Sequence, residues 1–188
     1  TLKKMRLSGL WDHLGYGFHR YSTDEEWLLP HFEKMLYDQA LMLLAYAEGW
    51  QISKNDLFKQ TCYQIIDYLL SRMKSDDGGF FSAEDADSEG EEGKYYTWTF
   101  HELEELRASK HISTDEFEFL CERFQLSLEG NMINEATRQS TERTILHLKE
   151  PFPRAGLRRF DTSREPPDAE PAPIMVCISS MNNIALSL

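Results

Sequence analysis

The sequence lacks a long apolar run. Its longest apolar stretch, around Leu41 to Ala47, is far shorter than the ~20 residues that a helix needs to cross a bilayer. It also shows no signal peptide, and it begins with Thr1 rather than Met. We therefore expect no membrane span and a cytoplasmic location, with mitochondrial and secreted locations left open.

Basic residues and cysteines are both scarce. There are 20 Lys and Arg against 32 Asp and Glu, so the net charge is −12. This charge argues against nucleic acid and anionic membranes as partners, whereas a neutral or cationic molecule is easier to accommodate. Cys62, Cys121 and Cys177 are widely spaced and form no CxxC pair. We expect free thiols, no bound metal and no other cofactor.

Helical periodicity dominates the first half of the chain. Apolar residues at three- and four-residue steps predict helices over Phe32–Glu48 and Asp56–Met73, with Pro30 near the first start and Gly49 at the first end. Asn55 suits the N-cap of the second helix. The short connection predicts an antiparallel hairpin that buries four residues, namely Leu43, Leu44, Ile65 and Leu69.

Two capping-box patterns predict further helices. Thr99 with Glu102 would open a helix to about Ala108, and Ser113 with Glu116 one to about Phe124. Strand-like alternation is limited to a short piece at residues 95–97. The predicted fold class is therefore all-α.

Three regions differ in composition. Residues 1–135 hold the predicted helices, and residues 136–173 are irregular and rich in Pro and Arg. Residues 174–188 are apolar enough to dock on another surface. We treat these regions as a partial helical domain, an irregular segment and an apolar C-terminal segment.

The stretches "DHLGYGFHRYS" and "PHFEKMLYD" concentrate reactive groups just before the first hairpin. Imidazoles titrate near neutral pH, so the candidate catalytic residues here are His13, His19 and His31, with Glu33 as a carboxylate. The candidate substrate-binding residues are Arg20, Tyr21, Tyr37 and Asp38. The alternative is that these groups form caps and surface ion pairs.

The stretch "GGFFSAEDADSEGEEGKYYTW" is acidic and rich in glycine. It begins like a calcium loop, but Tyr96 stands where an EF-hand needs a bidentate acid. Asp85 and Asp87 are instead candidate acid–base carboxylates, or they turn the loop through Asx-type bonds. Tyr96 and Trp98 could stack on a sugar, and the alternatives are a solvated acidic loop and ordinary core packing.

These three stretches together closely resemble the YyaL-like family, which is also the spermatogenesis-associated protein twenty family. The resemblance implies a thioredoxin-like domain followed by an (α/α)6 barrel similar to the N-acylglucosamine epimerases and six-hairpin glycosidases. This chain looks like the first half of that barrel, an incomplete (α/α)6 toroid. It departs from the family at Gly15-Tyr16-Gly17, where three glycines are usual, and at Gln39, where Asn is usual.

Two functions follow from this resemblance. The first is a carbohydrate-active enzyme of carbohydrate metabolism, in which His19–Tyr21, His31–Glu33 and Asp85–Asp87 line one cleft and a small carbohydrate is the substrate. The second is a non-catalytic interaction or redox-partner module that serves a thioredoxin-like domain absent from this chain.

Overall fold

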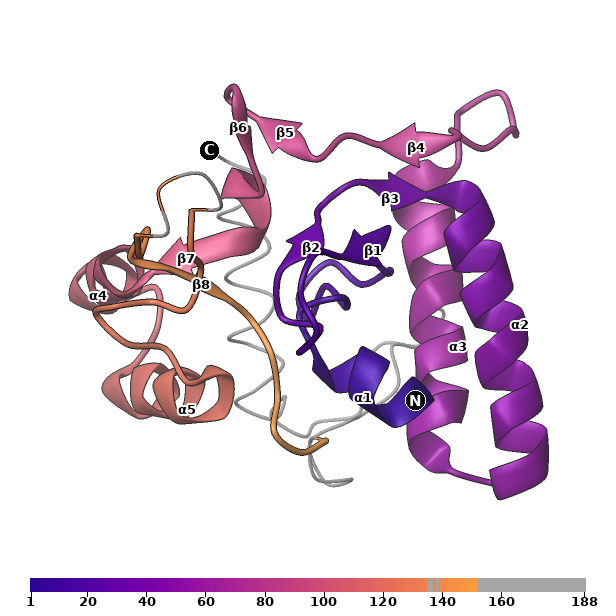
Figure 1. The fold of residues 1–188 in the computed structure, drawn as a ribbon, viewed down its shortest axis with the longest axis horizontal. Helices are drawn as coiled ribbons and strands as arrows, with labels where there is room; N and C mark the ends of the chain where they lie inside the picture. The colour runs from indigo at the N-terminus through magenta and orange to yellow at the C-terminus, as the bar shows by residue number, and fades with distance from the viewer. Residues whose placement is uncertain (135–136, 138, 152–188) are drawn as a thin grey trace.

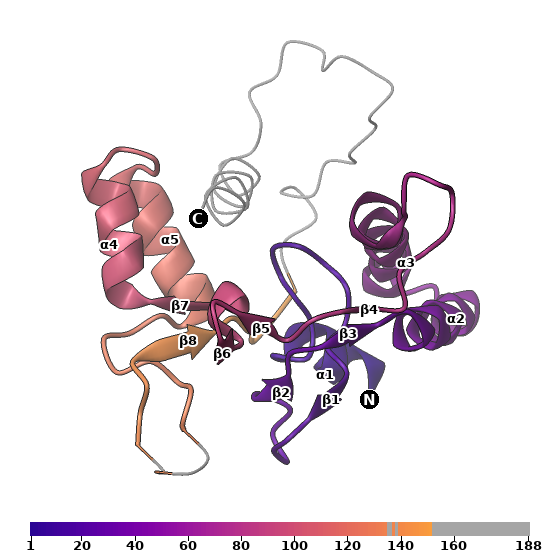
Figure 2. The ribbon, with the colours of Figure 1, turned by 90° about the horizontal axis from the view of Figure 1, so that it is seen from above.

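Two pairs of helices flank a middle layer of short strands and loops (Figure 1). The computed structural model describes residues 1–134, 137 and 139–151. Seen from above, the α2–α3 pair and the α4–α5 pair lie at opposite ends of the molecule, with the strands between them (Figure 2).

The first helical pair is the predicted antiparallel hairpin. It consists of α2 (Leu36–Ser53) and α3 (Asp56–Tyr68), and a π-helical turn (Leu69–Met73) extends α3 to the predicted end. The Asn55 side chain accepts a hydrogen bond from the Leu57 amide, so the predicted N-cap is confirmed. The inner face of the hairpin packs on the short helix α1 (Leu2–Leu7) and the loop after it. The fully buried residues at this contact are Trp11, Phe18, Tyr46 and Ile65.

The second helical pair follows the capping boxes. Helix α4 (Phe100–Ala108) begins after Thr99 and α5 (Thr114–Phe124) begins after Ser113, and both boxes form the reciprocal hydrogen bonds. A separate apolar cluster holds the two helices together. It includes Trp98, Leu103, Leu120 and Phe124.

Among the described residues, the middle layer contains four two-stranded antiparallel sheets. They are β1 (Tyr21–Ser22) with β2 (Pro30–His31), β3 (Lys34–Met35) with β4 (Ala83–Glu84), β5 (Asp87–Ser88) with β6 (Glu91–Glu92), and β7 (Thr97–Thr99) with β8 (Arg143–Ile145). A 3-10 turn (Lys94–Tyr96) precedes β7. The structure is about 44% helix and 16% strand, so it is mixed α/β and the predicted all-α toroid is wrong. Strands of two or three residues are too short to show alternation in a sequence.

The start of α2 differs from its prediction. Residues 32–35 are extended rather than helical because β3 pairs with β4, and Pro30 lies in β2 instead of a first helical turn. The helix also passes through Gly49 and ends only at Lys54, whose φ is 55°. Of the predicted core, Ile65 is fully buried, but Leu44 is 56% exposed because it lies on the outer side of the hairpin.

The predicted C-terminal regions lie mostly outside the described residues. Strand β8 falls in the described part of the Pro/Arg-rich segment, whereas residues 152–188 are not described. Within the described part of the chain, no helix is long and apolar enough to cross a membrane.

Candidate functional site

The three chemistry-bearing stretches meet in the middle layer. Strand β1 places Tyr21 opposite His31, and β3 places Lys34 opposite Glu84. Strand β6 then brings Glu92 from the acidic loop to within 2.6 Å of the His31 ring. These contacts are made by residues of the paired strands, so the site depends on the short sheets.

A buried ion pair lies beneath these strands. The Lys34 ammonium donates to the Asp12 carboxylate at 2.7 Å and to the Tyr16 carbonyl at 2.8 Å. It also lies 4.7 Å from the ring centroids of Tyr68 and Tyr96. Lys34 is only 1% exposed, so the chain neutralises and solvates this cation entirely from within.

The pKa of Asp12 follows from this contact. Burial by itself would raise the pKa of the carboxyl group, but Lys34 and His19 oppose burial, and the net pKa is lowered. The amides of Leu14 and Gly15 donate to the other carboxylate oxygen, each at 2.9 Å. Asp12 is therefore a charged structural anchor for the loop that follows it.

Glu84 extends the buried layer toward the surface. Its carboxylate accepts from the Tyr68 hydroxyl at 2.7 Å and from the Arg72 guanidinium at 3.0 Å. Burial favours a higher pKa for Glu84, but the nearby Lys34 charge and these two hydrogen bonds lower it overall. Ser71, Met73, Phe81 and Ala83 complete a surface depression of about 250 Å3 beside this pair.

Two of the predicted catalytic histidines are buried. His19 lies with its Nδ1 2.9 Å from the Phe32 carbonyl, and His13 with its Nε2 3.2 Å from the Ser8 carbonyl. Burial, helped by Lys34 for His19 and by Arg6 for His13, lowers the pKa of each imidazole to about 3. Both rings are neutral near pH 7, and the cavity between them, about 10 Å3, has room for one water molecule at most.

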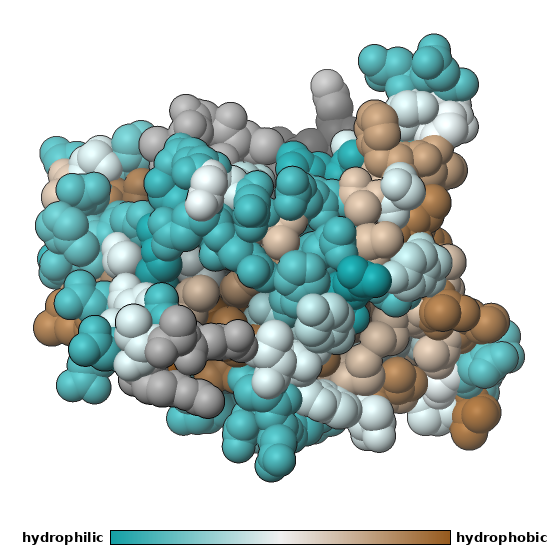
Figure 3. All heavy atoms as spheres, turned by 45° about the horizontal axis from the view of Figure 1, so that its top comes forward, coloured by the Kyte–Doolittle hydropathy of each residue, from teal (hydrophilic) through white to brown (hydrophobic). Residues whose placement is uncertain are grey.

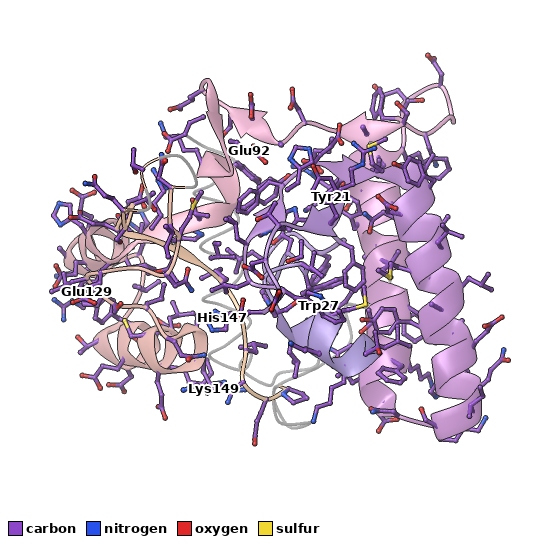
Figure 4. The ribbon with its side chains drawn as sticks, in the orientation of Figure 1. Tyr21, Trp27, Glu92, Glu129, His147 and Lys149 are labelled. Atoms are coloured by element: carbon purple, nitrogen blue, oxygen red, sulfur yellow. The ribbon has the colours of Figure 1, made fainter. Side chains whose placement is uncertain are left out.

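Of the three histidines predicted to be catalytic, His31 is the one that is accessible to solvent. Its Nδ1 lies 2.6 Å from Glu92 and its Nε2 3.7 Å from Glu33, which also accepts from Arg20 at 2.8 Å. The half-exposed Tyr21 ring lies 5.1 Å from the imidazole. We call these five residues, Arg20, Tyr21, His31, Glu33 and Glu92, the His31 ledge. Figure 4 labels two of them, Tyr21 on β1 and Glu92 on β6.

This geometry joins a titratable ring, two carboxylates, a guanidinium and an exposed aromatic face on one surface. Comparison with known proteins gives the chain a family. It is 42% identical over 142 residues to spermatogenesis-associated protein 20 of Mus musculus and 41% identical over 142 residues to that of Homo sapiens. The chain is a homologue of spermatogenesis-associated protein 20. The predicted family resemblance is thus confirmed.

The match to this family has a limited extent. It covers 70% of the present chain but 18% of each of these relatives, so the chain spans a small part of their length. An uncharacterized protein of Caenorhabditis elegans is 38% identical over a stretch of the same length. No model of a known protein family matches the chain.

The other predicted substrate-binding residues lie at different depths. Tyr37 is half exposed beside the ledge, and its contact with Arg20 is the main cause that raises the pKa of the guanidinium. Burial raises the pKa of Asp38. Tyr96 is stacked on Phe32 in the buried layer, and Trp98 belongs to the core under α4 and α5.

The predicted acidic pair does not reach the histidines. Asp85 accepts the Asp87 amide at 3.1 Å, an Asx-type turn, and both side chains are exposed. Neighbouring acids, Glu84 and Glu92, make the contacts instead. No group of three or more His, Cys, Asp or Glu residues able to hold a metal occurs among the described residues.

Sequence reasoning missed Lys34, Glu84 and Glu92. Lys34 carried no signal in the sequence, because a lysine is normally exposed. The strand-like burial of Phe32 and Lys34, both 1% exposed on either side of Glu33, is visible only in the structure. The acidic loop carried no signal either. Its six carboxylates are alike in sequence, and only the pairing of the strands selects two of them.

Proposed function

We propose that the His31 ledge binds a neutral carbohydrate and that His31 exchanges protons with it. The observation that supports this most is the imidazole between two carboxylates, with Glu92 at 2.6 Å on Nδ1 and Glu33 at 3.7 Å from Nε2. When a carboxylate fixes the imidazole through a hydrogen bond to one ring nitrogen, the other nitrogen can give a proton to the substrate or take one from it.

The surrounding residues suit a sugar. Tyr21 offers a half-exposed aromatic face on which the CH groups of a pyranose ring can lie. Arg20 and Glu33 offer a donor and an acceptor for hydroxyl groups. The net charge of −12 favours a neutral substrate over a sugar phosphate or an acidic sugar.

Each ledge residue then has a role. His31 would be the acid–base group, and Glu92 would orient its ring. Arg20 would hold the Glu33 carboxylate in place and leave an oxygen of Glu33 for a hydroxyl group. The remaining sequence of the longer relatives would supply the opposite wall and any thioredoxin-like partner domain.

A thermal-unfolding screen against neutral mono- and disaccharides tests this function. A sugar present at 100 times its dissociation constant should stabilise the chain by about 2.7 kcal/mol. His31→Gln should reduce that stabilisation and any turnover of the sugar. His101→Gln should change neither, since His101 lies on the exposed side of α4.

A second candidate is a non-catalytic interaction module. It is favoured by one observation: neither of the cavities described above includes His31, and the ledge lies on an open surface. Sugar binding that His31→Gln leaves intact, with no turnover by the unaltered chain, would support this module over the enzyme.

A further inference from the structure

The outer side of α2 is apolar where a surface helix is normally polar. Gln39 and Tyr46 point inward and are fully buried, as expected for a helix that packs on one side. On the opposite side, however, Leu41 is 64% exposed, Leu44 is 56% exposed and Ile52 is 86% exposed. A helix that is apolar on every side is normally covered on every side.

The neighbouring helix continues this surface. Tyr63 and Ile66 on α3 and Leu70 in the π-helical turn that extends it are exposed at three- and four-residue steps, so they share one face. Together with Leu41 and Leu44 they form what we call the outer hairpin face. Figure 3 shows hydrophobic residues gathered on the right side of the molecule, where α2 and α3 lie, while the middle of the same view is hydrophilic. An apolar patch of this kind marks a contact surface.

We propose that residues 174–188 of the same chain cover the outer hairpin face. This segment has no charged residue in its 15 positions. Ten of these residues are apolar, and five of the ten recur at three- and four-residue steps, in the order Ile174, Ile178, Met181, Ala185 and Leu188. An uncharged and mostly apolar segment matches a surface of leucine, isoleucine and tyrosine.

The connection is long enough to allow this contact. The described chain ends at Pro151, which accepts a hydrogen bond from Arg123 on α5. The residues from there to Ile174 can span roughly 70 Å when extended. Helix α2 is about 27 Å long. A tethered segment also binds at a high effective concentration, so a modest apolar contact suffices.

Cys177 makes the proposal measurable, because a covered thiol is alkylated slowly. In the full chain, we expect iodoacetamide to modify Cys177 about tenfold more slowly than in the Leu41→Ser/Leu44→Ser variant, as read by peptide mass spectrometry. Leu128→Ser is the matched control, since Leu128 is 71% exposed outside the hairpin. It should leave the Cys177 rate unchanged. The rate at Cys62, which packs in the hairpin cluster on α3, reports whether each variant keeps the hairpin folded.

Two results would overturn the proposal. Equal Cys177 rates in the unaltered chain and the double variant would mean that the segment does not lie on this face. Sedimentation velocity then distinguishes the two other possible partners of the outer hairpin face. A dimer that the double variant dissociates would assign the face to a second copy, and a monomer with an unprotected Cys177 would assign it to another protein.

Discussion

Replacing Lys34 with methionine should destabilise the protein strongly. The change keeps the apolar part of the side chain but leaves the Asp12 carboxylate buried without its ion-pair partner. Removing one member of a buried ion pair typically costs 3–5 kcal/mol. Because Asp12 keeps two backbone hydrogen bonds, we expect about 3 kcal/mol, the lower end of that range. This is a large share of a total stability of about 5–15 kcal/mol.

Urea unfolding at pH 7, followed by circular dichroism, measures this loss. Lys3→Met is the matched control, since Lys3 is exposed on α1, and it should change the free energy of unfolding by less than about 0.5 kcal/mol. Asp12→Asn and the Asp12→Asn/Lys34→Met pair complete a double-mutant cycle, with an expected coupling of at least about 1 kcal/mol. A loss below about 1 kcal/mol in Lys34→Met, or strictly additive changes, would refute the proposed coupling.

Three further changes test other parts of the structure. Because the pKa values of His13 and His19 are about 3, the unfolded chain binds more protons between pH 3 and pH 6.5. The contribution of the two neutral histidines to the free energy of unfolding should be fully present above about pH 6.5. Below that pH the free energy should fall by up to about 1.4 kcal/mol per pH unit for each histidine. Equal urea midpoints at pH 7.5 and pH 5 would contradict this. Gly93→Ala, whose Cβ would lie 2.4 Å from a buried phenylalanine ring, should lower the melting temperature well below that of Gly90→Ala, which has a similar φ and open space. Gln39→Leu removes the hydrogen bonds that its amide makes with the backbone N–H and C=O of buried Phe18, and it should cost about 2–4 kcal/mol in urea unfolding. A cost near zero would mean that water replaces the amide.

The helices could be predicted from local sequence signals, and the sheets could not. Asn55, Thr99 and Ser113 each mark a helix start through hydrogen bonds made within a few residues. The sheets pair residues that are distant in the chain, such as Lys34 with Glu84. Two-residue strands have no periodicity of their own, so their pairing depends on tertiary contacts.

The candidate site was predicted only in part, because it too depends on tertiary contacts. The crowding of polar groups around His31 was visible in the sequence. Burial was not, because histidines look alike until packing places His19 against Phe32 and leaves His31 at the surface. The choice of Glu92 over Asp85 likewise depends on how the acidic loop folds back across β2.

The most direct test of the His31 ledge is a sugar titration of the isotope-labelled chain, followed by nuclear magnetic resonance at the His31 and Tyr21 rings. The account predicts that a neutral sugar shifts both rings in a saturable manner. Tyr21→Ala should then weaken binding about tenfold through the lost ring contact, while Phe81→Ala, another exposed aromatic outside the ledge, should leave it unchanged. Sugars that shift neither ring, or a Tyr21→Ala variant that binds as tightly as the unaltered chain, would contradict it.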